Sequence, residues 1–186
     1  MQTEINNALE TLKQGGIILY PTDTVWGIGC DAANADAVAK IYALKEREDS
    51  KALICLVADD RMLKKHVRQV PQGAYNIMEV SERPLTIIYD DAQNLAPNLI
   101  AKDRTIAIRI PDNEFCYRLS RKLNSALVST SANISGQPAP KSYKEISNHI
   151  LKGVDYIVNL QHEKICDKPS SIIKLSNNGI VKVIRD

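Results

Sequence analysis

Short apolar runs alternate with amphipathic segments through most of this chain, and this alternation constrains the fold more than any other feature. Runs such as 17–20, 52–58 and 126–130 have the length and composition of buried strands. The segments between them, such as 35–47 and 114–124, carry apolar residues at helical spacing. Interleaved strands and helices are typical of α/β proteins. We therefore expect an α/β fold with a mixed, twisted β-sheet flanked by helices.

The same pattern gives approximate ends for each element. The expected strands are 17–20, 52–58, 85–89, 105–110, 126–130 and 155–160, followed by a hairpin of 170–175 and 180–185 around Asn178-Gly179. The expected helices run from an N-cap at Thr3 to Gly15-Gly16, and then over 35–47, 60–81, 114–124 and 142–151. Residues 60–81 are expected to form one or two helices, divided near Pro71.

Length and composition favour one soluble domain. The chain has 186 residues, of which 44% are hydrophobic and 25% charged, so it can bury a core without disulfides. We find no internal repeat or linker in the sequence and expect a single domain over residues 1–186. The formal net charge is only +2, so bulk electrostatics alone do not indicate a nucleic-acid-binding protein.

Cysteine and histidine usage favours neither a disulfide framework nor a metal site. The four cysteines are widely spaced, and the three histidines share no metal-ligand spacing. No stretch of the sequence approaches the ~18 apolar residues of a membrane-spanning helix. The N-terminus lacks a basic segment followed by an apolar run. We therefore expect no targeting segment and a cytoplasmic location.

The first of four polar clusters is 20–32, in which Thr22, Asp23 and Thr24 follow a predicted strand and a proline. A turn held by side-chain hydrogen bonds explains this cluster as well as a binding site does. Its glycines match neither of the phosphate-loop fingerprints.

The second cluster is 44–53, where Lys45, Arg47 and Lys51 lie between a helix and a buried strand. Cations at a helix C-terminus complement the helix dipole, so a solvated cap is the simpler interpretation. The functional alternative is a clamp for a polyphosphate, which Lys and Arg side chains bind well.

The third and fourth clusters lie on or just after predicted strands. Arg109 alternates with isoleucines in the strand 105–110, and a buried Arg needs an anionic partner. An internal ion pair or a solvated sheet face would explain it equally. In 127–136, Ser129, Ser131 and Asn133 are uncharged hydrogen-bonding groups at a strand end, where α/β proteins place ligands. They could instead cap a helix or satisfy loop backbone.

Together the clusters resemble a known family. The segments occur in the order GGIILYPTDTVWGIGCDA, IYALKERE, RPLT, TIAIRIP and LVSTSANISGQPAP, between Gly15 and Pro140. In this order they resemble the YrdC-like family of threonylcarbamoyl-AMP synthases, and the similarity continues more weakly through 168–175 and Arg185. The resemblance implies a concave, positively charged cavity in a mixed α/β fold. It also implies the short, single-domain form.

The resemblance implies an enzyme that joins L-threonine, bicarbonate and ATP into threonylcarbamoyl-adenylate and pyrophosphate. The product would serve the N6-threonylcarbamoyl modification of adenosine 37 in tRNA. Mg²⁺ would accompany ATP, and tRNA would be reached indirectly, through a downstream transferase complex. Two other interpretations stay open: a non-catalytic module that binds double-stranded RNA in ribosome assembly, and a carbamoyl-transfer domain of hydrogenase maturation.

The resemblance also assigns residues. It implies four ligands of threonine, namely Thr22, Arg109, Ser129 and Ser170. It implies seven ligands of the nucleotide, namely Lys45, Arg47, Lys51, Thr105, Ser131, Asn133 and Arg185. Lys45 and Arg47 would also stabilise charge in the reaction, and Asp23 is the one candidate general base. The sequence departs from the family pattern at Glu48, at Ser81-Glu82-Arg83 and at Pro169-Ser170-Ser171.

Overall fold

The computed structural model describes residues 1–47, 53–166 and 168–186. Its α-helices are α1 (Gln2–Lys13), α2 (Ala35–Leu44), α3 (Asp60–His66), α4 (Gln72–Val80), α5 (Glu114–Leu123) and α6 (Asn148–Gly153). Its strands are β1 (Ile18–Tyr20), β2 (Gly27–Gly29), β3 (Ile54–Leu56), β4 (Leu85–Tyr89), β5 (Ile106–Arg109), β6 (Leu127–Ser131), β7 (Tyr156–Ile157), β8 (Ser171–Leu175) and β9 (Val181–Arg185). A 3₁₀ turn, η1 (Tyr143–Glu145), precedes α6.

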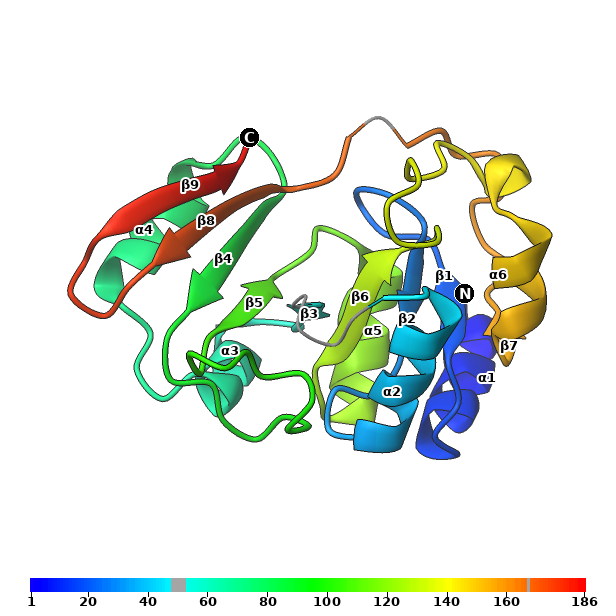
Figure 1. Cartoon of the computed structure of the whole chain (residues 1–186), viewed down its shortest axis with the longest axis horizontal. Coiled ribbons are helices and arrows are strands. Elements are labelled where there is room, and N and C mark those ends of the chain that lie inside the picture. The colour runs from blue at the N-terminus through cyan, green and yellow to red at the C-terminus, as the bar shows by residue number, and fades with distance from the viewer. Residues whose placement is uncertain (48–52, 167) are drawn as a thin grey trace.

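The strands of the described residues form one mixed sheet in the order β7-β1-β2-β6-β3-β5-β4-β8-β9. The pairs β1–β7, β3–β5 and β4–β8 are parallel, and the other neighbours are antiparallel. The hairpin of β8 and β9 lies at one end of the molecule, and α1 and α6 lie at the other (Figure 1). The expected α/β fold with a mixed sheet flanked by helices is confirmed. Within the described part of the chain, no helix has the length and apolarity needed to cross a membrane.

Helices cover both faces of the sheet. On one face, α1 and α5 pack over Ile18 and Tyr20 of β1, Leu56 of β3 and Leu127 of β6. On the other face, a larger core joins α2, α3 and α4 to strands that include Ile87 of β4. Burying each such side chain contributes about 1.5–3 kcal/mol, so these two cores hold the sheet between its helices.

The pairing register places polar side chains together on the face that α1 and α5 partly cover. Paired residues share a face, and residues two apart on one strand also share it. Ser129 pairs with Ile54, which pairs with Ala107, and Arg109 lies two residues further along β5. Continuing across the sheet in this way defines a polar face that comprises Gly27, Thr86, Thr105, Ala107, Arg109, Ser129, Ser131 and Arg185.

Most predicted elements are confirmed, with ends shifted by one to three residues. Residues 60–81 form two helices, and Pro71 stands at the N-cap of the second. The N-terminal helix begins at Gln2, so Thr3 lies inside it and the predicted N-cap was wrong. The final hairpin turns at Asn178-Gly179 as predicted, with Gly179 at φ +84°.

Three regions depart further from the prediction. The helix expected over 142–151 is the 3₁₀ turn η1 followed by α6, because Ile146 is extended and the hydroxyl of Ser147 caps a new helix. The strand expected over 155–160 is only the short β7. The first polar cluster, for which a turn and a binding site both stayed open, also contains the strand β2, which was not predicted.

Strand β2 exists because glycine lets its neighbours approach closely. A Cβ on Gly29 would lie 2.3 Å from the carbonyl oxygen of Val128 on β6 and 2.7 Å from the ring of Tyr20 on β1. Both distances are shorter than van der Waals contact, so a larger residue would push these strands apart. The sheet on which the polar face depends therefore requires glycine at this position.

We expect Gly29→Ala to lower the free energy of unfolding by about 1–3 kcal/mol, the usual effect of overpacking a core. Gly73→Ala is the matched control, because a Cβ there would meet no atom within 4 Å. In helix α4, that control should be neutral or stabilising by up to about 1 kcal/mol. Urea unfolding of both variants measures the difference, and equal stabilities would contradict the close approach of β2 and β6.

Candidate active site

Arg109 is the most deeply buried guanidinium of the polar face, with 4% of its surface exposed. Its Nη1 donates to Oδ1 of Asp23 in an ion pair, and its Nη2 donates to the hydroxyl of Thr24 at 3.2 Å. Its Nε is buried and has no hydrogen-bond partner among the described residues. The ion-pair alternative is therefore correct for Arg109.

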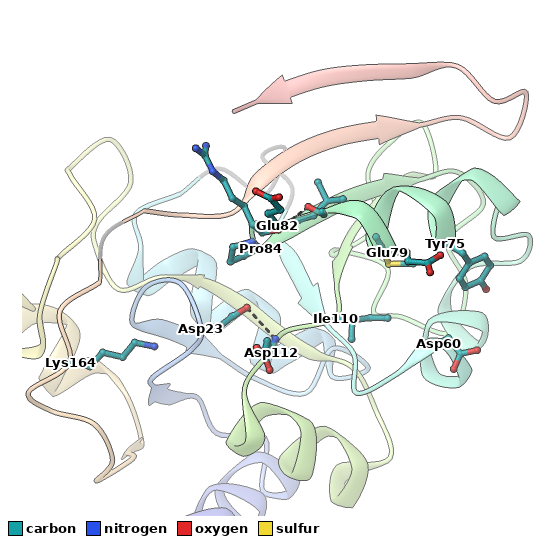
Figure 2. Close-up of a pocket in the computed structure, with 13 residues that line it drawn as sticks. Asp23, Asp60, Tyr75, Glu79, Glu82, Pro84, Ile110, Asp112 and Lys164 are labelled. Atoms are coloured by element: carbon teal, nitrogen blue, oxygen red, sulfur yellow. Dashed lines mark hydrogen bonds between the residues drawn. The ribbon is translucent and has the colours of Figure 1, made fainter.

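Asp23 uses both carboxylate oxygens. Oδ1 accepts from Arg109, and Oδ2 accepts from the backbone N–H of Asp112 at 3.3 Å. Figure 2 shows Asp23 beside Asp112, with the bond between them drawn as a dashed line. A general base needs an oxygen aimed at the proton that it removes. The geometry thus gives Asp23 a place in the site but offers little support for the role of base.

Thr22 and Ser129 flank the bare backbone of Gly27. A Cβ on Gly27 would lie 3.2 Å from Oγ of Ser129 and 3.3 Å from Cγ2 of Thr22. The hydroxyl of Thr22 donates to the carbonyl of Val25 at 2.7 Å and accepts from the N–H of Thr24 at 3.0 Å. The loop before β2 is thus internally hydrogen-bonded, as the turn interpretation predicted, and it also lies directly over the polar face.

Lys45 is the C-cap residue of α2, but only 1% of its surface is exposed. Its Nζ donates to the carbonyl oxygens of Ser131 and Asn133, each at 2.5 Å, and its own carbonyl accepts from Ser135 N–H at 2.8 Å. The solvated-cap interpretation is therefore wrong for Lys45. Burial, with a smaller effect of nearby Arg47, lowers the pKa of Lys45 to about 8.

The rest of the basic cluster is only partly described. Arg47 follows Lys45 by two residues, is half-buried, and donates its backbone N–H to Tyr42 at 3.0 Å. Lys51 and Glu48 lie outside the described residues. The structure therefore brings Lys45 and Arg47 together, and the role of Lys51 stays a prediction.

The loop after β6 is held from inside. The Nδ2 of Asn133 donates to the carbonyls of Ile134 at 2.9 Å and Gln137 at 2.7 Å. Its Oδ1 is buried without a partner among the described residues, and so can accept a hydrogen bond from a ligand. Lys45 and Asn133 thus both bond to backbone carbonyls of the segment 131–137, which contains the expected nucleotide ligands Ser131 and Asn133.

The predicted ligands divide between two ends of the polar face. Because β6 runs antiparallel to β3 while β5 runs parallel to it, Ser131 is level with Thr105, and Leu127 is level with Arg109. Thr105 and Arg109 are four residues apart, or about 13 Å at ~3.3 Å per residue. Lys45 joins the end that holds Ser131.

Ser170 and Arg185 join the end that holds Arg109. The hydroxyl of Ser170 lies 2.8 Å from that of Thr86, which is level with Arg109 on the adjacent strand. Arg185 donates to the carbonyl of Ser170 through Nε at 3.1 Å and Nη2 at 2.6 Å. Burial and the charge of Arg109 lower the pKa of Arg185. The structure thus places Arg185 with the expected threonine ligands, apart from the other expected nucleotide ligands.

The hydroxyl of Thr105 bonds to a carboxylate outside the basic cluster of Lys45 and Arg47. Its hydroxyl donates to Asp103 at 2.7 Å, and Asp103 forms an ion pair with Lys174 at 3.1 Å. Hydrogen bonds from Thr105 and Lys174 lower the pKa of Asp103. A nucleotide contact by the Thr105 hydroxyl would therefore have to compete with this carboxylate.

Two cavities meet at the loop that holds Asp23. One has a volume of about 750 Å³ and extends towards Asp60, Tyr75 and Glu79, as Figure 2 shows. The other has a volume of about 610 Å³ and reaches Ser171. Both cavities are lined by four shared residues, namely Asp23, Arg83, Pro84 and Lys164. The departure at Ser81-Glu82-Arg83 thus lies on the rim of the site, and the positive charge expected for the cavity stays a prediction.

Three residues that bond to the expected ligands were not predicted from the sequence. Thr24 accepts from Arg109, Thr86 bonds Ser170, and Lys164 donates through Nζ to the carbonyl of Thr22 at 2.9 Å. The sequence could have indicated two of them, because Thr24 lies within the first polar cluster and Thr86 is a polar residue in an apolar strand. No sequence feature indicated Lys164, because its contact with Thr22 spans 142 positions of the chain.

Comparison with known proteins identifies the family. The family model described as Telomere recombination, for Sua5, YciO and YrdC proteins, matches residues 10–186. This chain belongs to the Sua5/YciO/YrdC family. A protein of Halorhodospira halophila named threonylcarbamoyl-AMP synthase is 35% identical to it over 156 residues, which cover 83% of this chain and 81% of that protein.

Solved structures of the family share the fold. E. coli YciO is 26% identical, with a TM-score of 0.87, and the match covers all of this chain and 90% of that one. P. abyssi Sua5, solved with L-threonine, is 24% identical with a TM-score of 0.81. That match covers 94% of this chain but only 52% of Sua5, so this chain spans about half the length of that protein.

The pKa of Lys45 predicts a pH dependence of nucleotide binding. The ammonium is charged below its pKa, so affinity for ATP should be highest below pH 8 and should fall as the pH rises through about 8. Calorimetric titration of ATP across this range measures the effect. Lys45→Met should bind weakly at every pH without this decline.

Lys40→Met is the matched control, because exposed Lys40 also donates to a backbone carbonyl, that of Gly15 at 2.8 Å. This control should keep the wild-type pH dependence and affinity. An identical pH profile in Lys45→Met and in the wild type would show that Lys45 does not contact the nucleotide.

Proposed function

We propose that this protein is a threonylcarbamoyl-AMP synthase, which condenses L-threonine, bicarbonate and ATP into threonylcarbamoyl-adenylate and pyrophosphate. One observation carries the proposal. A single sheet face holds Arg109 at one end, and Lys45 lies beside the other end. A guanidinium suits a carboxylate, and an ammonium suits a phosphate. Between them lies Ser129, which is uncharged and 7% exposed. This arrangement suits an amino acid and a nucleotide that meet in the middle.

Relatives support the proposal in two ways. The H. halophila relative carries the name of this enzyme, and P. abyssi Sua5, which has the same fold, was solved with L-threonine. The product is proposed to feed the N6-threonylcarbamoyl modification of adenosine 37 in tRNA. On this proposal, tRNA is reached indirectly, through a downstream transferase complex.

The chemistry needs positioning more than proton transfer. The amine of threonine adds to the carbon of bicarbonate, and loss of water gives a carbamate. An oxygen of the carbamate then attacks the α-phosphorus of ATP as pyrophosphate leaves. Arg109 would orient the carboxylate of threonine, so that its amine points towards Ser129. Holding two reactants in this way can supply about 7–11 kcal/mol of the barrier reduction. Lys45 and Arg47 would stabilise the charge that builds on the phosphates.

Mg²⁺ is proposed to enter with ATP as part of the substrate. Across residues 1–47, 53–166 and 168–186, no group of three or more His, Cys, Asp or Glu side chains is arranged to hold a metal ion. The metal is proposed to neutralise the charge of the phosphates, and Lys45 and Arg47 are proposed to have the same role.

We expect pyrophosphate release from ATP to require threonine and bicarbonate together. The measurement is a coupled pyrophosphate assay in which each substrate is omitted in turn. Equal ATP turnover without threonine or without bicarbonate would make the protein a general nucleotide hydrolase. Absence of turnover, together with tight binding of double-stranded RNA, would favour the non-catalytic RNA-binding module.

Arg109→Lys should weaken the use of threonine by at least about tenfold, or ~1.4 kcal/mol. A guanidinium binds a carboxylate through two parallel hydrogen bonds, and a lysine ammonium cannot reproduce this fork. The affinity for ATP, measured by calorimetry, should change much less, because Lys45 lies at the other end of the face. Equal losses for both substrates would indicate that Arg109 only maintains the fold.

A further inference from the structure

In the guanidinium of Arg109, both Nη atoms donate hydrogen bonds and Nε donates none to the described residues. The guanidinium has five N–H donors in a plane. Asp23 takes one at Nη1, and Thr24 takes one at Nη2 at 3.2 Å. The Nε–H, on the side edge of the plane, is buried and has no partner among the described residues. A carboxylate can bind this edge side-on, through Nε–H and an Nη2 hydrogen together.

The position of Asp23 complements this pattern. Only 10% of the Asp23 side chain is exposed, and its second oxygen is held by the backbone N–H of Asp112. The carboxylate is therefore fixed on two sides before any ligand binds. It can fix the guanidinium in turn, because Arg109 comes from a rigid central strand and Asp23 from the loop before β2.

We infer that Asp23 is a positioning residue, which holds Arg109 by its Nη1 end so that the Nε edge stays aimed at the carboxylate of threonine. The inference rests on the proposed function and assigns Asp23 a role in it. Arg109 then serves two carboxylates, one from the protein and one from the substrate. The Nε–H is buried without a partner among the described residues, which costs free energy, and the carboxylate of threonine would accept from this donor.

Two other roles for Asp23 make different predictions. A general base would change the rate of the chemical step and its pH dependence, and would leave the affinity for threonine intact. A purely structural ion pair would change stability, and would affect threonine and ATP alike. A positioning residue would change the affinity for threonine alone, because ATP binds at the Lys45 end.

The test is Asp23→Asn, which keeps the shape of the side chain and removes its charge. Calorimetry with the full chain should show threonine affinity lower by at least about tenfold, the value of one charge-assisted contact. The affinity for ATP should stay within about twofold. The KM for threonine should rise, and kcat should keep the wild-type dependence on pH.

Asp60→Asn is the matched control, because it removes an equal charge from the lining of the same cavity, where Asp60 pairs with Lys64 and not with Arg109 or Asp23. It should leave the affinity for threonine unchanged. A fall in kcat with unchanged threonine affinity in Asp23→Asn would overturn the inference in favour of a base. Parallel losses for threonine and ATP would overturn it in favour of a structural ion pair.

Two further variants keep the test valid if Asp23→Asn does not fold. Asp23→Glu retains the buried ion pair but displaces the guanidinium by a methylene, so threonine should bind more weakly and ATP equally well. Wild-type affinity in this variant would refute positioning. In an Arg109→Lys background, Asp23→Asn should add little, because the guanidinium that it positions is absent, whereas additive losses would show two independent roles.

Failure of the inference differs from failure of the proposed function. If the wild type binds threonine in an Asp23-dependent way but releases no pyrophosphate with bicarbonate present, the proposed reaction fails and the positioning role stands. If the wild type releases pyrophosphate and Asp23→Asn binds threonine normally, the reaction stands and the positioning role fails.

Discussion

The pairing of β6 with β2 on one side and β3 on the other is the constraint on which the site depends. Side chains alternate between the two faces of a strand, so a shift of one residue would reverse them all. In the observed register, Ser129 and Ser131 share a face with Arg109, and Leu127 faces the core under α5. Gly29 permits this register, because any side chain there would strike β6.

Two buried cations stand near opposite ends of that face, and each is stabilised differently. Removing an ion from water costs several kcal/mol, which hydrogen bonds to charged groups offset at about 1.5–3 kcal/mol each. Lys45 is stabilised by two backbone carbonyls, and among the described residues no carboxylate forms an ion pair with it. Arg109 is stabilised by the carboxylate of Asp23, which compensates its charge. The first arrangement suits a multiply charged phosphate, and the second suits a single carboxylate bound at the free edge.

The sequence predicted the fold class well because apolar periodicity reports local structure. The long apolar strands β4 and β6 and the amphipathic helix α5 were identified close to their observed ends. Strand β2 was not predicted because two of its three residues are glycine, which has a low propensity for strands. Pairing with β1 and β6, and not local propensity, makes this segment a strand. The Ser147 cap was missed because a continuous helical spacing of apolar residues conceals a break between two short helices.

The sequence could suggest candidate ligands but not the contacts that they make. Motif order suggested Arg109, Lys45 and Ser129, and the structure places all three on or beside one face of the sheet. The ion pair between Arg109 and Asp23 spans 86 positions, and only the pairing of strands brings such residues together. The burial of Lys45 was likewise hidden, because a lysine after a helix is usually exposed.

The departures from the family pattern can be interpreted in the light of this geometry. Glu82 and Arg83 line the larger cavity and are exposed, so they change its rim and leave the polar face intact. Ser170 stands at the second departure, yet its hydroxyl still reaches Thr86 and its carbonyl still accepts from Arg185. Both contacts depend on one hydroxyl and one backbone oxygen, which the sequence change preserves. The departure at 81–83 therefore lies at the exposed rim of the cavity, whereas Ser170 is buried and stays bonded to Thr86 on the strand beside Arg109.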